Sequence, residues 1–158
     1  MFREIRRFKQ SLTKEEIVEV LTNELRGVLS VQGDDGYPYG VPVNHWYNPE
    51  NGKIYFHGGK GGHKLDSIAR SDKVSFCVYD EGYKKEGDWA LNIKSVVVFG
   101  RASIVEDWEE ASYAIRQLCY KFTDDEEYID NDFAKNGAAT VCVCITPEHI
   151  TGKLVNES

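Results

Sequence analysis

The hydrophobic pattern begins with a helical period and then changes to the period of β-strands. Val18, Leu21 and Leu25 recur at intervals of three and four residues, and they follow a Thr13–Glu16 pair with the spacing of a capping box. This pattern predicts an amphipathic helix of about a dozen residues. After this helix the period falls to two, and turn-forming residues divide the sequence into strands. The predicted strands are 27–32, 39–48, 53–57, 73–80, 89–105, with a break near 94–95, and 139–146.

Three further helices are predicted between the strands. A short helix follows the glycine-rich segment 58–62. A second helix spans 108–122, where apolar residues alternate at spacings of three and four, and an acidic helical stretch follows at 124–134. Because the chain has no internal repeat and no linker, the pattern predicts a single domain, 1–158, that is mainly β with α additions. An antiparallel barrel of about six or seven short strands is the expected architecture.

The composition narrows the range of functions. The chain has 158 residues, and its net charge of −7 argues against a nucleic-acid-binding protein because it repels phosphodiester backbones. The longest apolar runs are about five residues, against roughly 20 for a membrane span, and the first residues lack the apolar core of a signal peptide. No membrane association is therefore expected. The four cysteines form no C-x-x-C pair and are expected to be reduced thiols in a cytoplasmic protein.

The turn at 49–52 predicts the register of the hairpin around it. It sets Asn44 opposite His57 and Trp46 opposite Tyr55, and directly paired residues share a face of the sheet. These four residues form a face of aromatic side chains with polar ends. Such a face is either an amphipathic outer surface or a contact for a ligand or second subunit, and the pattern leaves both open. The opposite face carries core residues, namely Val41, Val43, Tyr47, Ile54 and Phe56.

A glycine-rich segment joins the end of one strand to the start of a helix. Free backbone N–H groups and the positive end of the helix dipole make this arrangement suitable for an anion such as a phosphate. Lys60, Lys64 and either His57 or His63 would add positive charge, and Gly62 directly precedes the helix. The segment does not match the Walker pattern. A flexible exposed loop is the alternative interpretation, and the sequence does not choose between the two.

Metal and nucleophile chemistry receive little support. His45, His57 and His63 are not spaced as metal-ligand pairs usually are, so no metal site is expected. The chain has no G-x-S-x-G segment, and no cysteine has a histidine partner nearby in the sequence.

Five segments in a fixed order carry a resemblance to a known family: 37–45, 54–64, 73–78, 95–101 and 150–153. Together they resemble the pyridoxamine 5′-phosphate oxidase-like, FMN-binding split barrel family, and in particular its Nim-type branch, which is related to nitroimidazole resistance. The resemblance extends from about residue 27 to residue 154. It implies a split β-barrel and a homodimer with FMN in clefts at the subunit interface.

The resemblance also implies roles for individual residues. Val43 and Asn44 would contact the flavin ring, Ser95 and Val96 would lie beside its redox-active edge, and the phosphate would be held by His57, His63 and Lys64. The vitamin-synthesising oxidases need further basic residues for a pyridoxamine phosphate substrate. No matching arginine cluster is present in this sequence, so that reaction is not expected.

Two functional hypotheses follow. The first is an FMN-dependent oxidoreductase that reduces a small organic acceptor such as a nitro-heterocycle, with the flavin supplying the redox chemistry. His45 is then the best candidate for a proton donor because an ordinary histidine titrates near working pH; a core histidine facing Phe56 is the alternative. The second hypothesis is a flavin- or haem-binding module for storage, sensing or delivery without turnover.

Overall fold

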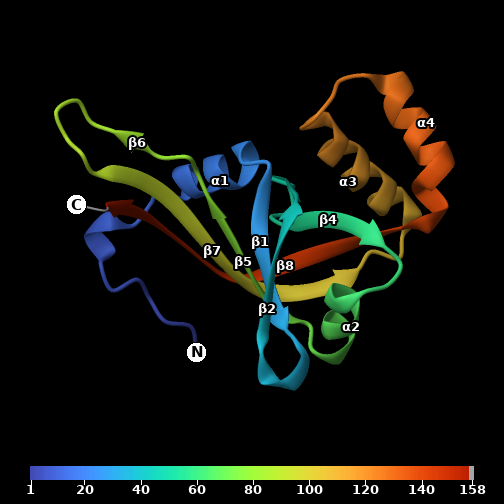
Figure 1. The fold of residues 1–158 in the computed structure, drawn as a ribbon, viewed down its shortest axis with the longest axis horizontal. Coiled ribbons are helices and arrows are strands. Elements are labelled where there is room, and N and C mark those ends of the chain that lie inside the picture. Colours follow the sequence, from blue (N-terminus) through green and yellow to red (C-terminus); the bar gives the residue numbers. More distant parts are fainter. Residues whose placement is uncertain (157–158) are drawn as a thin grey trace.

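One antiparallel sheet, curled into a half-barrel, carries the helices at its edges and ends (Figure 1). The structure is a computed structural model that describes residues 1–156. Its strands are β1 (Arg26–Gln32), β2 (Pro38–Asn44), β3 (Trp46–Tyr47), β4 (Ile54–Gly59), β5 (Lys73–Tyr79), β6 (Tyr83–Lys84), β7 (Leu91–Ile104) and β8 (Thr140–Asn156). The helices are α1 (Lys14–Asn23), α2 (His63–Arg70), α3 (Trp108–Tyr120) and α4 (Glu126–Asn136), with short 3₁₀ turns η1 (Phe8–Gln10), η2 (Asp34–Gly36) and η3 (Gly137–Ala139).

The strand order is β2-β1-β5-β7-β8-β4-β3, and β6 pairs with β7 outside this path. The long strand β8 joins the two halves of the sheet because it pairs with β4 near its start and with β7 along most of its length. A bulge between Phe99 and Gly100 bends β7. A Cβ at Gly100 would lie 2.5 Å from the Thr146 carbonyl oxygen, so the two strands approach here at a distance that only glycine allows.

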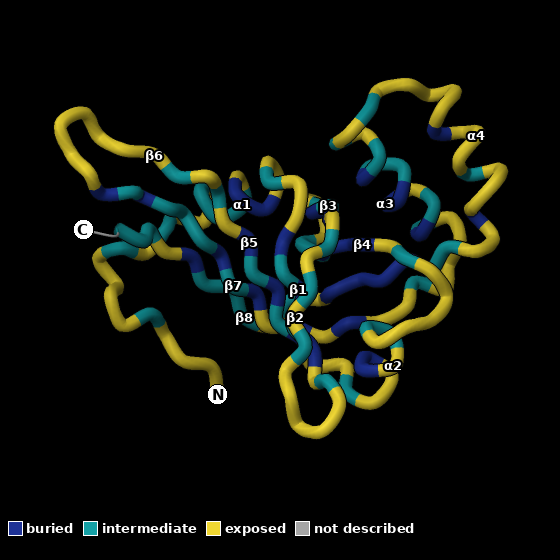
Figure 2. The backbone as a smooth tube through the Cα atoms, in the orientation of Figure 1, coloured by how far each residue is buried: buried dark blue, intermediate teal, exposed yellow. Residues whose placement is uncertain are grey.

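The main core lies on the concave side of the sheet. Alternate residues of β1, β4, β5, β7 and β8 point inward and pack against α1 and α2 (Figure 2). The capping box predicted for α1 is present, since the Glu16 N–H donates to Thr13 Oγ1 at 3.2 Å and the Thr13 N–H donates to Glu16 Oε1 at 3.0 Å. The fully buried members of the core include Leu21, Leu29, Ile54, Phe76, Val78, Val96, Val98 and Ile145.

Helix α3 covers the face of β4 that was expected to be an open aromatic surface. Tyr55 is only 2% exposed, and it packs with Cys142 and Cys144 of β8 against the alanines and Ile115 of α3. Its hydroxyl donates to Glu110 Oε1 at 2.8 Å. The Trp46 and Tyr55 face is therefore an internal contact of the chain. The alternative that Tyr55 contacts a second subunit is therefore wrong, because a helix more than 50 residues later in the sequence folds back over it.

The predicted elements are present, but several of their bounds differ. The strand predicted at 39–48 is divided at His45 into β2 and β3. The break predicted near 94–95 is absent, and β7 is continuous there. The last strand continues well past residue 146, although Pro147 and Gly152 interrupt its pattern. Gly152 is required there because a Cβ would lie 2.6 Å from Ile17 Cγ1 of α1.

The predicted hairpin register is confirmed where the strands still pair. Trp46 lies opposite Tyr55, and the Asn48 N–H donates to the Lys53 carbonyl at 2.9 Å. Beyond His45 the pairing changes, and Asn44 lies opposite Arg26 of β1. Within residues 1–156, no helix is long and apolar enough to cross a membrane.

Two glycines on paired strands provide a matched test of the packing. A Cβ at Gly27 would lie 2.6 Å from Phe76 Cζ and 2.8 Å from the Cys77 carbonyl, whereas at Gly40 the nearest atom would be 3.5 Å away. We expect Gly27→Ala to lower the free energy of unfolding by about 1–3 kcal/mol through overpacking. Gly40→Ala should leave it unchanged or raise it by up to about 1 kcal/mol. Urea denaturation measures both, and equal losses would contradict the packing described.

Candidate functional site

The predicted site residues lie in four different parts of the fold. Asn44 and His57 lie together at the split between β2 and β4. The glycine-rich segment and the start of α2 follow directly after β4. Ser95 lies on the outer face of β7. His45 is buried in the core at the division between β2 and β3.

Asn44 and His57 line one pocket, as the predicted hairpin register suggested, although their strands no longer pair at that point. The pocket has a volume of about 150 Å³ and lies between the ends of β2 and β4 and the α3–α4 hairpin. Typical small-molecule sites measure about 300–1,000 Å³. This α3–α4 pocket is therefore too small to enclose a cofactor alone. Its other lining residues are Leu118, Cys119, Phe122, Thr123, Tyr128, Ile129 and Asp132.

The polar groups of this pocket differ in their partners. Asn44 Oδ1 accepts from Arg26 Nε at 3.2 Å, which leaves the amide nitrogen directed elsewhere. Burial by the surrounding protein lowers the pKa of His57, and the nearby Asp132 carboxylate partly opposes this effect. His57 is therefore mainly neutral at pH 7. It can accept or donate a hydrogen bond to a ligand at the split.

The strand β2 is an edge strand, which decides how Val43 can contribute. Its side chain is half-buried against the main core, so it does not face outward with Asn44. However, β2 has β1 on one side only, and the backbone groups on its other side face the split. Val43 pairs with Gly27 two residues before the His45–Leu25 pair, whose N–H···O hydrogen bond is formed, so the backbone groups of Val43 point toward β1 and those of Asn44 point toward the split. Contrary to the role implied by the resemblance, neither the side chain nor the backbone of Val43 is open to a ligand there.

The start of α2 has the features expected of an anion site. Gly62 caps the helix with a φ of 118° and no side-chain hydrogen bond, so the first N–H groups of α2 are not capped by a side chain. A Cβ placed on Gly58, Gly59, Gly61 or Gly62 would meet no atom within 4 Å, and the space above the segment is open. Contrary to the predicted loop, Gly58 and Gly59 continue β4 and pair with Val141 and Thr140.

The basic side chains around the start of α2 are placed differently from one another. Lys64 is half-buried and Lys60 is exposed. The His63 ring stacks on Tyr39 with 4.0 Å between ring centroids, and its Nε2 lies 3.9 Å from Asp34 Oδ2. These contacts hold His63 against the β1–β2 turn. An anion at α2 would therefore meet the Lys64 ammonium and the backbone N–H groups first.

Ser95 and Val96 face opposite sides of the sheet. Ser95 is half-buried on the outer face, where its hydroxyl donates to the Lys153 carbonyl at 3.5 Å. Val96 is fully buried in the main core, and its strand is paired with β5 and β8. Only Ser95 presents a side chain to a ligand on this face.

His45 is a structural residue in this fold. It is fully buried, its Nε2–H donates to the Leu21 carbonyl at 2.8 Å, and its ring meets Phe76 edge to face. Burial lowers its pKa to about 4. This geometry supports the core alternative over the proton-donor role, with Phe76 as the aromatic neighbour instead of Phe56.

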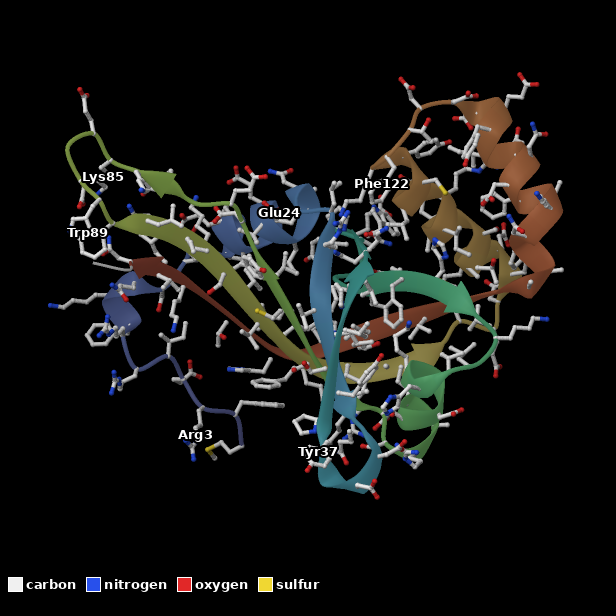
Figure 3. All side chains as sticks on the ribbon, viewed as in Figure 1. Arg3, Glu24, Tyr37, Lys85, Trp89 and Phe122 are labelled. Atoms are coloured by element: carbon white, nitrogen blue, oxygen red, sulfur yellow. The ribbon has the colours of Figure 1, made fainter. Side chains whose placement is uncertain are left out.

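The backbone of His45 is also held at the ends of two helices. Its N–H donates to the Leu25 carbonyl at 3.2 Å. Lys121, just after α3, donates from Nζ to the carbonyls of His45 and Glu24 at 2.7 and 2.6 Å. Burial lowers the pKa of Lys121 to about 8, and the Glu24 carboxylate opposes that shift. Figure 3 shows the neighbouring Phe122 and Glu24 at this end of the molecule.

The remaining titratable groups do not form a further catalytic cluster in the described part of the chain. No three His, Cys, Asp or Glu side chains among residues 1–156 come close enough to hold a metal ion. Burial raises the pKa of the Cys142 thiol to about 12, and it also raises the pKa of Cys77, Cys119 and Cys144. These thiols are therefore not activated as nucleophiles.

Sequence reasoning missed the helical wall of the α3–α4 pocket. Phe122 and Tyr128, at its mouth, are 48% and 66% exposed. The Asp132 carboxylate is the acidic group that raises the pKa of His57. The 3–4 spacing of α3 did extend to Phe122. It identified an apolar stripe but not the strand on which the stripe packs.

Comparison with known proteins places the chain in a fold family. The family model described as pyridoxamine 5′-phosphate oxidase matches residues 13–154. No curated protein matches the chain.

Solved structures similar to this one share the split-barrel fold. A candidate 5-nitroimidazole antibiotic resistance protein from Bacteroides thetaiotaomicron superposes with a TM-score of 0.76 at 18% identity, over 92% of this chain and 87% of that one. A FAD-binding protein from Mesorhizobium loti gives 0.68 at 22% identity, over 92% and 97%. A FAD- and haem-binding protein from Mycobacterium smegmatis gives 0.70 at 19% identity, over 95% and 74%.

The burial of His45 predicts a pH-dependent stability. Its pKa is about 4 in the folded chain and about 6.5 when unfolded, so between these values the unfolded state binds more protons. The free energy of unfolding should therefore be highest above pH 6.5 and should fall by about 3 kcal/mol as the pH drops to 4. Urea denaturation at several pH values measures this slope. His45→Phe should flatten it and His63→Gln should not; an unchanged slope in His45→Phe would contradict the assignment.

Proposed function

The chain belongs to the pyridoxamine 5′-phosphate oxidase family, and from this premise we propose that it binds FMN at the split between β2 and β4 and acts as an oxidoreductase. The observation that carries the proposal is the start of α2, where backbone N–H groups without a side-chain cap open onto clear space next to Lys64. A dianionic phosphate matches these donors and the helix dipole.

The residues on either side of the split would orient the ring. The free backbone edge of β2 at Asn44 offers hydrogen-bonding groups to a flat heterocycle. His57 lies across the split on β4 and is mainly neutral, so it adds a hydrogen bond without a fixed charge. Bound there, the flavin would supply hydride or single-electron transfer. The chain would hold it, position the acceptor and exclude water.

The distance between the ring contacts favours a homodimer. Asn44 on β2 and Ser95 on β7 both lie on the outer face, but β1 and β5 separate their strands. Three strand spacings amount to about 14 Å, which two short side chains of one chain do not bridge. A second copy related by two-fold symmetry would bring its own Ser95 to the ring. We propose the cleft to be shared in this way, which also explains why the α3–α4 pocket is small.

The outer face of β1, β2 and β5 is suited to be the subunit contact in place of the buried Trp46 and Tyr55 face. It carries half-buried or exposed small and apolar side chains, among them Val28, Pro42 and Cys77, in adjacent paired positions. Because these side chains remain partly open in the single chain, a second copy would remove them from water.

Substitution at the centre of that face tests the dimer. Light scattering should give about twice the 18.0 kDa chain mass for the unmodified protein. Val28→Glu should shift it to the monomer mass and lower the bound FMN, because a buried unpaired charge opposes association. Tyr37→Glu, at an exposed turn (Figure 3), is the matched control and should change neither. A monomer with full FMN occupancy would refute the shared cleft.

The phosphate contact is tested by comparing two flavins. Lys64→Ala removes a charge-assisted contact and should weaken FMN binding about ten- to a hundredfold. Riboflavin, which lacks the phosphate, should bind more weakly than FMN and respond little to the substitution. Flavin fluorescence titration measures both, with Lys14→Ala on exposed α1 as the control. Equal affinities for FMN and riboflavin would show that the start of α2 does not hold a phosphate.

A flavin- or haem-binding module without turnover is the second candidate function. The observation that favours it is His45, whose burial removes the expected proton donor from the site. The absorption spectrum of the purified protein distinguishes flavin from haem.

Reoxidation of the reduced protein separates the two candidates. If the protein is an oxidoreductase for nitro-heterocycles, flavin reduced anaerobically with dithionite should be reoxidised faster by metronidazole than by buffer alone. Free FMN at the same concentration is the control for the solution reaction. Reoxidation no faster than in buffer would favour the binding module.

A further inference from the structure

Away from the split, the N-terminal segment (residues 1–12) lies beside the paired strands β7 and β8 (Figure 1). A pocket lined by basic residues lies between them. We propose that this N-terminal pocket binds a small organic anion, through its carboxylate or phosphate group, with Arg6, Arg7 and Lys153. The pocket has a volume of about 360 Å³, within the range of small-molecule sites. Its lining residues are Ile5, Arg6, Arg7, Gln10, Ser95, Val97, Thr151, Lys153, Val155 and Asn156.

The charge of the N-terminal pocket is unlike that of the rest of the chain. Of the lining residues among 1–156, three are cationic and none is acidic, although the chain as a whole carries −7. Among the described residues, Arg6, Arg7 and Lys153 form no ion pair. Elsewhere on the chain, by contrast, Arg70, Arg101 and Arg116 each pair with carboxylates. Three uncompensated cations around one cavity attract an anion that neutralises them.

The backbone next to the two arginines is fixed by hydrogen bonds. The Gln10 N–H donates to the Arg7 carbonyl at 2.9 Å and closes the turn η1. Ser11 forms a β-bridge with Lys153, and the Leu12 N–H donates to the Gly152 carbonyl at 2.9 Å. The N-terminal segment is therefore fastened to β8 directly beside the pocket. This attachment holds the arginines of the segment and the lysine of the strand on one cavity.

The remaining lining indicates the form of the ligand. Gln10, Ser95 and Thr151 add neutral hydrogen-bonding groups. The side chains of Ile5, Val97 and Val155 add an apolar part to the same cavity. A fully hydrated inorganic ion would leave that apolar part unused. The lining fits a molecule with a small apolar body and one anionic group.

The position of Ser95 relates this pocket to the proposed flavin. Ser95 lines the pocket and is also the residue proposed to meet the redox-active edge. An anion held here would be a substrate next to the flavin, a link that rests on the proposed function. Anion binding itself does not depend on it, because none of the cations in the pocket belongs to the start of α2.

Calorimetric titration of the FMN-saturated protein tests the proposal with three probes. Phenyl phosphate and benzoate carry the two anionic groups on the same ring, and benzyl alcohol is the neutral control. We expect the preferred anion to bind at least tenfold more tightly than benzyl alcohol, and which of the two is preferred identifies the group. An affinity for benzyl alcohol equal to that for both anions would overturn the proposal.

Charge-neutral variants locate the binding. Arg6→Gln with Arg7→Gln should weaken the preferred anion at least tenfold, and Lys153→Gln, on a different element, should also weaken it. Arg3→Gln with Lys9→Gln removes the same charge from the same segment outside the pocket, and it should change the affinity less than twofold. Equal losses in both double variants would reveal only diffuse attraction and overturn the site.

FMN content separates this proposal from the previous one. The Arg6, Arg7 double variant should retain its FMN, as measured by absorbance, while losing the anion. Loss of anion binding in Lys64→Ala, with no change in the Arg6, Arg7 double variant, would place the anion at α2 and overturn the N-terminal site.

Discussion

The division of one strand at His45 is the constraint on which the split of the barrel depends. β2 pairs with β1 and β3 pairs with β4, so the chain must leave one partner and join another at this residue. His45 makes the change by turning its ring into the core toward Leu21, while Lys121 ties its carbonyl to the end of α1. Both side chains satisfy carbonyls at a helix C-terminus, where the helix has no partners of its own. The free edge of β2 beyond this point is what leaves backbone groups open to a ligand.

The elements and the hairpin register follow from the sequence because both are local properties. Alternation fixes the face of each side chain, and the turn at 49–52 fixes Trp46 against Tyr55. The covering of Tyr55 by α3 is not local. An aromatic face with polar ends has the same pattern whether a ligand, a second subunit or a distant helix packs on it. The length of β8 was underestimated for a similar reason, since Gly152 interrupts the strand pattern only because Ile17 of α1 needs its space.

The placement of the predicted site residues agrees with the expected faces where local backbone patterns decide it, and differs where a position was transferred from the family alone. Asn44 and His57 share a pocket because the alternation of side chains along their strands places both on the same side of the hairpin. Gly62 begins α2 without a side-chain cap because the segment has no Ser, Thr, Asp or Asn there. Val43 and Val96, taken over from the family resemblance, turn their side chains into the core. A resemblance along the chain identifies the strands. Which residues of a strand reach a ligand is decided by the alternation of their side chains between its two faces.

The two anion sites proposed above draw their positive charge from different sources, on a chain whose net charge is −7. At α2 the charge comes from backbone dipoles and one lysine, which suits a group that must be held in a fixed orientation. In the N-terminal pocket it comes from long side chains on an exposed segment, which suits exchange with solvent. The segment 1–10 has four basic residues and one acidic residue. Its position over β7 and β8 therefore makes the local electrostatic potential positive, although the whole chain is negatively charged. Because the net negative charge repels anions elsewhere, the two proposed sites would concentrate them, and the spacing between the sites would then limit which anionic molecules reach the proposed flavin cleft.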